Sequence, residues 1–285
     1  MRWSLLLQYV LPHRALSRLV YWATRWTWTP WKDFLISTII KNYNVDMSQA
    51  LQPDALAYSS FNAFFTRALT PGARSAPVDP RAVACPADGT ISQLGAVVAD
   101  QSGGGRIFQA KGFDFSVAEL LGDEVAAAAY TNGSFSTIYL SPRDYHRVHM
   151  PLAGTLRETV HIPGRLFSVA PFTVEAVPRL FARNERLVCH FDSVGTDGSS
   201  IPFCVVMVGA MLVSSVETVW SGLEIPPYAS AITRKNWRDK NIRLERFAEM
   251  GRFNMGSTVI VLLPQSCVLS GNLAAGNTVQ VGQPL

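Results

Sequence analysis

Three short stretches of the sequence carry side chains that can activate a hydroxyl group and direct it at a carbonyl. Cys85-Pro-Ala-Asp-Gly-Thr90 contributes Asp88, Ser141-Pro-Arg-Asp-Tyr-His-Arg-Val-His-Met-Pro151 contributes His146 and His149, and Gly256-Ser257-Thr258 contributes a serine. Aspartate, histidine and serine are the parts of a relay that makes a serine nucleophilic. A Gly-Ser step alone is a weak signal, so the serine gains meaning only through these partners.

The spacing of the two histidines limits how they can act. At positions i and i+3 they share a face of a helix, but they lie on opposite faces of a strand. Pro151 and the apolar-polar alternation favour a turn that leads into a strand, so we expect only one histidine to meet Asp88. Two alternatives are a metal site made by both histidines and an acid, and histidines that only satisfy hydrogen bonds. No third metal ligand has a recognisable spacing, so no metal is predicted.

The chain has an unusually apolar composition, which limits the kinds of helices and strands that can position these residues. The 285 residues suffice for one large domain or two ordinary ones. They are 48% apolar and 16% charged, against roughly 25% charged in an average soluble protein. Residues 198–216 lack charge but contain Pro202 and Gly209, and their centre is β-branched, which favours buried strands over a membrane-spanning helix. Four scattered cysteines indicate neither a disulfide framework nor a zinc site, which fits a reducing cytosol.

The first 32 residues hold the positive charge of the chain, with five basic residues and no acid against a net charge of +4 overall. On a helix at about 100° per residue, Arg14, Arg18 and Arg25 fall on one face, and Leu19 and Trp26 belong to the opposite, apolar face. Further aromatic rings follow, so the segment is typical of an interfacial helix on an anionic membrane. The alternative is an amphipathic helix whose apolar face packs on the core of the protein.

The hydrophobic spacing predicts an α+β protein. Helical spacing continues from residue 31 to about 69, with a break near Pro53. After Pro71, Gly and Pro punctuate short β-rich runs, and a short helix is expected at 117–121. The strands are expected at residues 87–94, 137–140, 147–150, 155–162, 186–192, 203–213, 258–263 and 278–281. We predict an N-terminal helical membrane-association region, 1–70, and a mainly antiparallel β catalytic domain with short helices, 71–285.

Two further regions stand out by their charge. Residues 253–285 contain no charged side chain, which predicts burial. A basic cluster at 234–252 is expected to be a solvated loop, with attraction to phosphate or headgroups as the alternative. Nucleic acid is not expected, because no recognition helix or aromatic-interleaved basic strand accompanies the cluster.

Several of these stretches together resemble bacterial phosphatidylserine decarboxylases. The resemblance is carried by Cys85-Pro-Ala-Asp-Gly-Thr90, residues 139–151, Phe181-Ala-Arg-Asn-Glu-Arg-Leu187, Val216-Glu-Thr-Val-Trp220 and Met250-Gly-Arg-Phe-Asn-Met-Gly-Ser-Thr258. It runs in order along nearly the whole chain. The usual Leu-Gly-Ser-Thr of the family is Met255-Gly-Ser-Thr here, a swap that conserves volume.

The resemblance implies a proenzyme that cuts itself between Gly256 and Ser257. Asp88 would orient His149, which would take the proton of Ser257, and the serine oxygen would attack the carbonyl of Gly256. Elimination from the resulting ester would leave a dehydroalanine at 257, and its tautomerisation and hydrolysis, with loss of ammonia, would give a pyruvoyl group. That cofactor would form a Schiff base with the amine of phosphatidylserine and accept electrons as carbon dioxide leaves, giving phosphatidylethanolamine. His146 is the expected proton donor in this second reaction.

The same resemblance implies two chains, a large β chain of residues 1–256 and a small α chain of 257–285, peripheral on the cytoplasmic side of the inner membrane. Further self-association stays open. Phe113, Phe167 and the Pro163-Gly164 turn are candidates for lining a lipid pocket. The competing functions are a lipid hydrolase that uses Asp88, His149 and Ser257 without self-cleavage, and a non-catalytic carrier or lipid-binding β module. A carrier should present a modifiable lysine on a hairpin tip, and no lysine follows Lys240.

Overall fold

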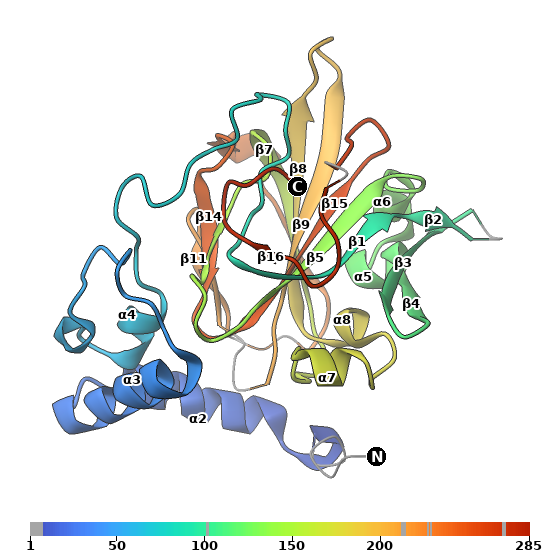
Figure 1. The fold of residues 1–285 in the computed structure, drawn as a ribbon. Helices are drawn as coiled ribbons and strands as arrows, with labels where there is room; N and C mark the ends of the chain where they lie inside the picture. The colour runs from blue at the N-terminus through green and yellow to red at the C-terminus, as the bar shows by residue number, and fades with distance from the viewer. Residues whose placement is uncertain (1–7, 101–102, 212–214, 227, 229, 270–271) are drawn as a thin grey trace.

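The computed structural model describes residues 8–285 except 101–102, 212–214, 227, 229 and 270–271. Helices gather at the N-terminal side, and sheets with a few short helices make up the rest (Figure 1). The helices are α2 (His13–Arg25), α3 (Thr29–Tyr43), η1 (Ala55–Ala57), α4 (Phe61–Phe65), α5 (Val117–Leu121), α6 (Glu124–Ala128), α7 (Pro171–Val174), α8 (Leu180–Arg183) and η2 (Arg238–Lys240). The α+β prediction is confirmed.

Among the described residues, the strands form one nine-stranded sheet, one of four strands and one of three, all with antiparallel pairing. The nine-stranded sheet has the order β12 (Thr233–Asn236), β7 (Gly154–Ile162), β8 (Arg186–Val194), β9 (Ser200–Val208), β15 (Ser257–Leu263), β5 (Ser134–Leu140), β1 (Gly89–Ala96) and β16 (Thr278–Val279), with β13 (Arg243–Leu244) beside β7. The four-stranded sheet has the order β11 (Gly222–Ile225), β10 (Val216–Thr218), β14 (Glu249–Phe253) and β6 (Arg147–His149). The three-stranded sheet has the order β2 (Val98–Ala99), β3 (Gly105–Ala110) and β4 (Phe113–Ser116).

Strand β15 is the most enclosed part of this architecture. It pairs with β5 on one side and β9 on the other, and all seven of its residues are buried. Its alternate side chains enter two different cores: Ile260 and Leu262 pack in one, and Val259, Val261 and Leu263 pack in the other. A strand covered on both faces has an almost continuous apolar sequence, which explains the run from Val259.

Helix α2 has the reverse arrangement. Its polar residues His13, Ser17 and Thr24 are buried against the protein, whereas Leu19 and Trp22 are 67% and 72% exposed. The predicted separation of an apolar face is confirmed, but the alternative in which that face packs on the core is wrong. Polar interactions hold the helix against the rest of the protein instead. Arg25, for example, donates a hydrogen bond to Ser215 Oγ and forms an ion pair with Glu217.

The predicted elements agree with the structure in the long strands and differ in the short ones. The helix at 117–121 is confirmed, and β9 ends at Val208, before Gly209, so the predicted strand 203–213 is too long. Its last predicted residues, like Arg2, lie outside the described residues. Within the described part of the chain, no helix has the length and apolarity needed to cross a bilayer.

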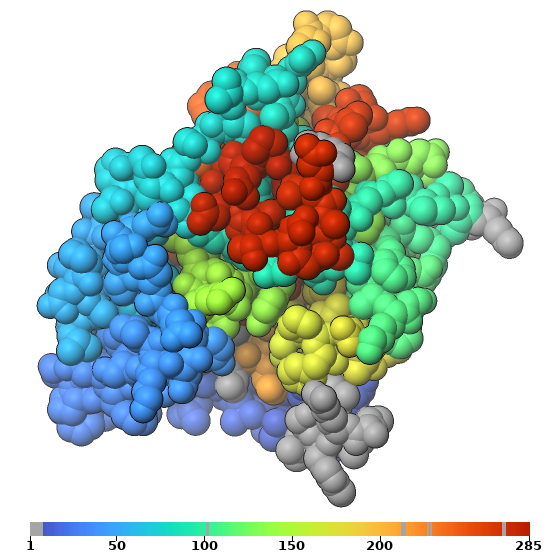
Figure 2. All heavy atoms as spheres, in the orientation of Figure 1, coloured from blue at the N-terminus to red at the C-terminus, as the bar shows by residue number. Residues whose placement is uncertain are grey.

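The expectation that residues 253–285 are buried throughout is wrong. Strand β15 is buried, but Val268 is 83% exposed and most of residues 272–278 are exposed. Figure 2 shows atoms of this C-terminal segment in the middle of one face of the molecule. Burial therefore accounts for the absence of charge only in part of this segment: Phe253, strand β15 and residues near the end such as Val281 and Leu285 are buried, whereas the stretch between them is largely exposed.

Candidate active site

Ser257 and Gly256 lie at the start of β15, inside the protein. Ser257 pairs with Leu140 of β5, and its side chain is fully buried, with no hydrogen-bond partner for Oγ among the described residues. A Cβ placed on Gly256 would lie 3.7 Å from His146 Nε2 and 3.4 Å from the Leu140 carbonyl oxygen. The Gly256-Ser257 bond is therefore next to His146, and both the hydroxyl and the Nε2 atom have unused hydrogen-bonding capacity.

The hydrogen bond at its other ring nitrogen determines the tautomer of His146. Nδ1 lies 2.8 Å from the carbonyl oxygen of Asp144. A carbonyl oxygen only accepts, so Nδ1 carries the proton and Nε2 has the free lone pair. Nε2 has no partner among the described residues. Complete burial lowers the pKa of His146 to about 3, because it disfavours the protonated form, so the ring is neutral at ordinary pH.

His149 occupies a neighbouring but different environment. Its Nδ1 lies 2.7 Å from the carbonyl oxygen of Phe247, and its Nε2 lies 3.1 Å from the Tyr145 hydroxyl. By the same reasoning Nδ1 donates to the carbonyl and Nε2 accepts from the tyrosine. Burial lowers the pKa of His149, so this ring also favours the neutral form. Both ring nitrogens of His149 are engaged.

Asp88 faces an arginine and the C-terminal segment. Arg74 binds both carboxylate oxygens of Asp88, with Nε 3.0 Å from Oδ1, and the backbone N–H of Val281 donates to Oδ1 at 2.8 Å. The expected contact between Asp88 and one of the histidines is absent from the described residues, and the charge of Asp88 acts on His149 only through space. The next residue, Gly89, allows close approach of β1 and β5, because a Cβ there would collide with the Tyr139 carbonyl.

The N-terminal segment supplies a wall of this site. The Phe65 ring of α4 lies over the His146 ring with centroids 4.1 Å apart. Met255, which precedes the glycine, packs against the helical cluster of α3 and α4. Asn62 Nδ2 donates to Asn254 Oδ1 at 3.1 Å. The segment around the Gly256-Ser257 bond is therefore held between the sheets and residues 61–65.

The structure brings together His146, Gly256 and Ser257, and it leaves Asp88 and His149 in an adjoining cluster. Sequence reasoning missed Phe65, Arg74 and Tyr145 as neighbours of these residues. Tyr145 precedes His146 in a stretch already singled out, but nothing in the sequence links Arg74 to Asp88. Phe113 lies in β4, and Phe167 is buried beneath Tyr9 and His13, so their role in a lipid pocket stays a prediction. The described residues include no cluster suited to a metal ion.

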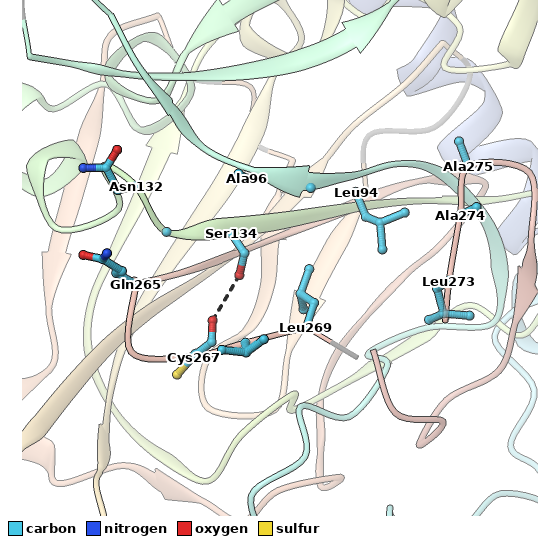
Figure 3. A pocket seen from close by; sticks show the side chains of 13 residues that line it. Leu94, Ala96, Asn132, Ser134, Gln265, Cys267, Leu269, Leu273, Ala274 and Ala275 are labelled. Atoms are coloured by element: carbon cyan, nitrogen blue, oxygen red, sulfur yellow. Dashed lines mark hydrogen bonds between the residues drawn. The ribbon is translucent and has the colours of Figure 1, made fainter. Parts of the chain in front are cut away.

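A cavity of about 600 Å³ lies at the opposite end of β15 (Figure 3). Leu94, Ser134 and Leu269 are among its lining residues, and Ser134 Oγ donates to the Cys267 carbonyl oxygen at 3.3 Å. Ser134 is paired with Leu263, whereas Leu140 is paired with Ser257, so the length of the strand separates this cavity from the candidate site.

Two family models and several curated proteins match this chain. The family model described as phosphatidylserine decarboxylase matches residues 61–285, and one described as PSD matches residues 4–44. A phosphatidylserine decarboxylase proenzyme of Xanthomonas axonopodis pv. citri (strain 306) is 61% identical over 281 residues, or 98% of this chain and 96% of that protein. Proteins of the same name are 62% identical in Xanthomonas campestris pv. campestris (strain B100) and 57% identical in Stenotrophomonas maltophilia (strain R551-3), with the same coverage.

Proposed function

The chain belongs to the phosphatidylserine decarboxylase family, and from that premise we propose that it is a proenzyme that cuts itself and then converts phosphatidylserine to phosphatidylethanolamine and carbon dioxide. The observation that carries the proposal is the burial of Ser257 together with a free His146 Nε2 close to the position of Gly256. This places a hydroxyl group and a neutral imidazole near the bond that the resemblance marks for cutting.

In the first reaction, Ser257 Oγ loses its proton to a neutral imidazole and attacks the carbonyl carbon of Gly256. The nitrogen of residue 257 leaves, and an ester joins Gly256 to the serine oxygen. Gly256 suits this role because it leaves the carbonyl open. Its φ is not in the left-handed range and a Cβ would meet only ordinary contacts, so the glycine is not required by backbone strain.

We assign the proton acceptor to His146, because its free Nε2 lies next to the position of Gly256, and the transfer requires Ser257 Oγ to turn toward it, since neither atom has a hydrogen-bond partner among the described residues. The resemblance instead implies His149 oriented by Asp88, and that assignment requires the Tyr145 hydroxyl to release His149 Nε2. Asp88 would then act on His149 through space, from its position between Arg74 and Val281. Replacement by glutamine separates the two: a general base contributes about 10²- to 10⁴-fold to a rate, so the variant that slows cutting this much identifies the base.

In the second reaction, the pyruvoyl group made from Ser257 would supply the electron sink for the charge left by departing carbon dioxide. The site suits a pyruvoyl group at position 257, because this residue is buried and lies near His146. His146 is the proposed proton donor to the substrate carbon, because its Nε2 faces the position of residues 256 and 257. After the cut, chains 1–256 and 257–285 would stay together through the pairing of β15 with β5 and β9.

The exposed apolar residues of α2 and α3 support a peripheral position on a membrane, and we propose the cytoplasmic side of the inner membrane, where the lipid substrate would be found. Leu19, Trp22, Trp26 and Phe34 are exposed, and a concave apolar patch of about 500 Å³ lies among Leu19, Trp22 and Trp26. Such a patch with aromatic rings suits the headgroup layer.

Mass spectrometry of the purified protein tests the proposal. We expect two chains of about 28 and about 3 kDa, dividing the 31.3 kDa of the whole, a blocked N-terminus on the small chain, and loss of activity with hydroxylamine or borohydride. The Ser257→Ala variant should stay whole. A wild-type chain that is active while intact would overturn the proposal and favour the hydrolase.

A further inference from the structure

A second hollow lies between residues 51–68 and the strands β6 and β14. Its volume is about 440 Å³, and three arginines from three different segments line it: Arg67, Arg147 and Arg252. The described residues that line it include no aspartate or glutamate, and none of the five candidate site residues is among them. The hollow is therefore separate from the site around Ser257 and strongly basic.

Two of the three arginines have carboxylate partners just outside the hollow. Arg147 Nη1 lies 2.9 Å from Glu249 Oε2, and Arg252 Nη2 lies 2.6 Å from Glu217 Oε2. Glu217 is shared, because Arg25 of α2 lies 3.7 Å from its other oxygen. These two carboxylates thus pair with Arg25, Arg147 and Arg252, and among the described residues no acid forms an ion pair with Arg67.

Arg67 is the arginine without a counter-charge. Its residue is only 4% exposed, and Nη2 donates to the carbonyl oxygen of Arg143 at 3.0 Å. Nε and Nη1 have no partner among the described residues. Burial lowers the pKa of Arg67, and the acids that raise it, such as Asp144 and Asp88, act only through space. A buried guanidinium normally has a bound anion or carboxylate, because an uncompensated charge is expensive to bury.

We propose that this hollow is a binding site for a phosphate group, carried either by the headgroup of an anionic phospholipid or by a free phosphate ion. Guanidinium groups bind phosphate oxygens with paired, charge-assisted hydrogen bonds. The Ser60 side chain also lines the hollow; its oxygen accepts from Ala63 N–H, which leaves the hydroxyl proton available for a phosphate oxygen. The volume leaves room for more than the phosphate itself.

Occupation of the hollow would join the two parts of the molecule. Arg67 and Ser60 belong to the N-terminal segment, whereas Arg147 and Arg252 belong to β6 and β14, which lead to His149 and to Gly256. A bound phosphate would supply the missing negative charge and hold the segment that carries Phe65 against these strands. The proposed ligand is therefore a phosphate group, and its structural effect is to hold the N-terminal segment against β6 and β14. Decarboxylation itself does not require either.

Isothermal titration calorimetry on the full-length Ser257→Ala protein tests the site without depending on decarboxylation. The probes are inorganic phosphate and dihexanoyl phosphatidylglycerol below its micelle concentration. We expect saturable binding that Arg67→Gln weakens at least about tenfold, through loss of a charge-assisted hydrogen bond. Arg106→Gln is the matched control, because Arg106 pairs with Asp114 on the small sheet, and it should leave binding unchanged.

A second variant guards against misfolding of Arg67→Gln. Ala63 lines the hollow within α4, and Ala63→Glu puts a carboxylate beside the surplus charge. We expect an equal or higher melting temperature and loss of phosphate binding. Tighter binding of the lipid than of inorganic phosphate identifies a headgroup site, and equal binding identifies a free-ion site. Absence of binding by both probes, or unchanged binding in both hollow variants, overturns the proposal and leaves the proposed function untouched.

Discussion

Strand β15 and helix α2 are both rich in apolar side chains, and the molecule uses these side chains in opposite ways. β15 lies between two strands, with every residue buried and alternate side chains in two cores. α2 buries His13, Ser17 and Thr24 and turns Leu19 and Trp22 outward. The apolar side chains therefore serve internal packing in β15 and form an outward surface on α2, which also carries three arginines. The amphipathic pattern of α2 does not by itself show which of its faces meets the protein.

The largest effect is expected from a charge placed in β15. Val261→Asp puts a carboxylate in a fully buried, unpaired position, which should cost more than about 4 kcal/mol of folding free energy and leave little soluble protein. Val268→Asp is the matched control in the same charge-free segment, 83% exposed, and should change stability by less than about 0.5 kcal/mol. Denaturant unfolding measures both. Equal tolerance of the two would contradict the assignment of β15 to the core.

A charge on the outward face of α2 should affect membrane binding without affecting folding. Leu19→Glu should lower the affinity for phospholipid vesicles at least about tenfold, because it removes apolar area from the contact, and leave the unfolding free energy unchanged. Co-sedimentation with phosphatidylcholine vesicles containing phosphatidylglycerol gives the affinity. The control is Val125→Glu on α6, 87% exposed on the catalytic part. If both variants bind vesicles as the wild type does, α2 is not the membrane contact.

The smallest effect concerns the junction of the two regions, where Phe65 of the helical part covers His146 beside β15. Burial lowers the pKa of His146 in the folded state to about 3, from the ordinary value of 6.5. Between these pH values the unfolded chain binds a proton that the folded chain does not, so stability falls as pH drops below about 6.5 and is constant above it for this group. The slope is at most about 1.4 kcal/mol per pH unit.

His146→Gln in the Ser257→Ala background should remove this contribution, which lowers the dependence of the unfolding free energy on pH by up to about 1.4 kcal/mol per pH unit. Urea unfolding from pH 5 to pH 8 measures it, and His190→Gln provides a comparison, since burial lowers the pKa of His190 to about 4 as well. An unchanged slope in His146→Gln would mean that His146 is not buried as a neutral ring.

Sequence reasoning found the regular elements whose pattern is local. The helix at 117–121 was identified by its own spacing, and β15 begins one residue before the predicted strand. It missed the strands of the three-stranded sheet, the strands β10 and β11, and the strands β12, β13 and β14, which lie in or overlap the region 234–252 that was expected to be a loop. Most of these strands have two to five residues, which are too few to show a clear alternation. Sequence reasoning named His146, Gly256 and Ser257, but it did not identify Arg74 as the partner of Asp88. That contact depends on how the loop between the two residues folds back, and no sequence pattern indicates it.

The position of Ser257 at the start of β15 also sets the order of events in the life of the chain. The Gly256-Ser257 bond lies close to His146 only when β15 has paired with β5 and when Phe65 and Met255 have closed the N-terminal side. Under the proposed function, a copy with a misplaced strand or an undocked helical segment would never acquire its cofactor. The cut would thus serve as a quality check, in which only correctly assembled molecules become active and defective ones remain inert precursors.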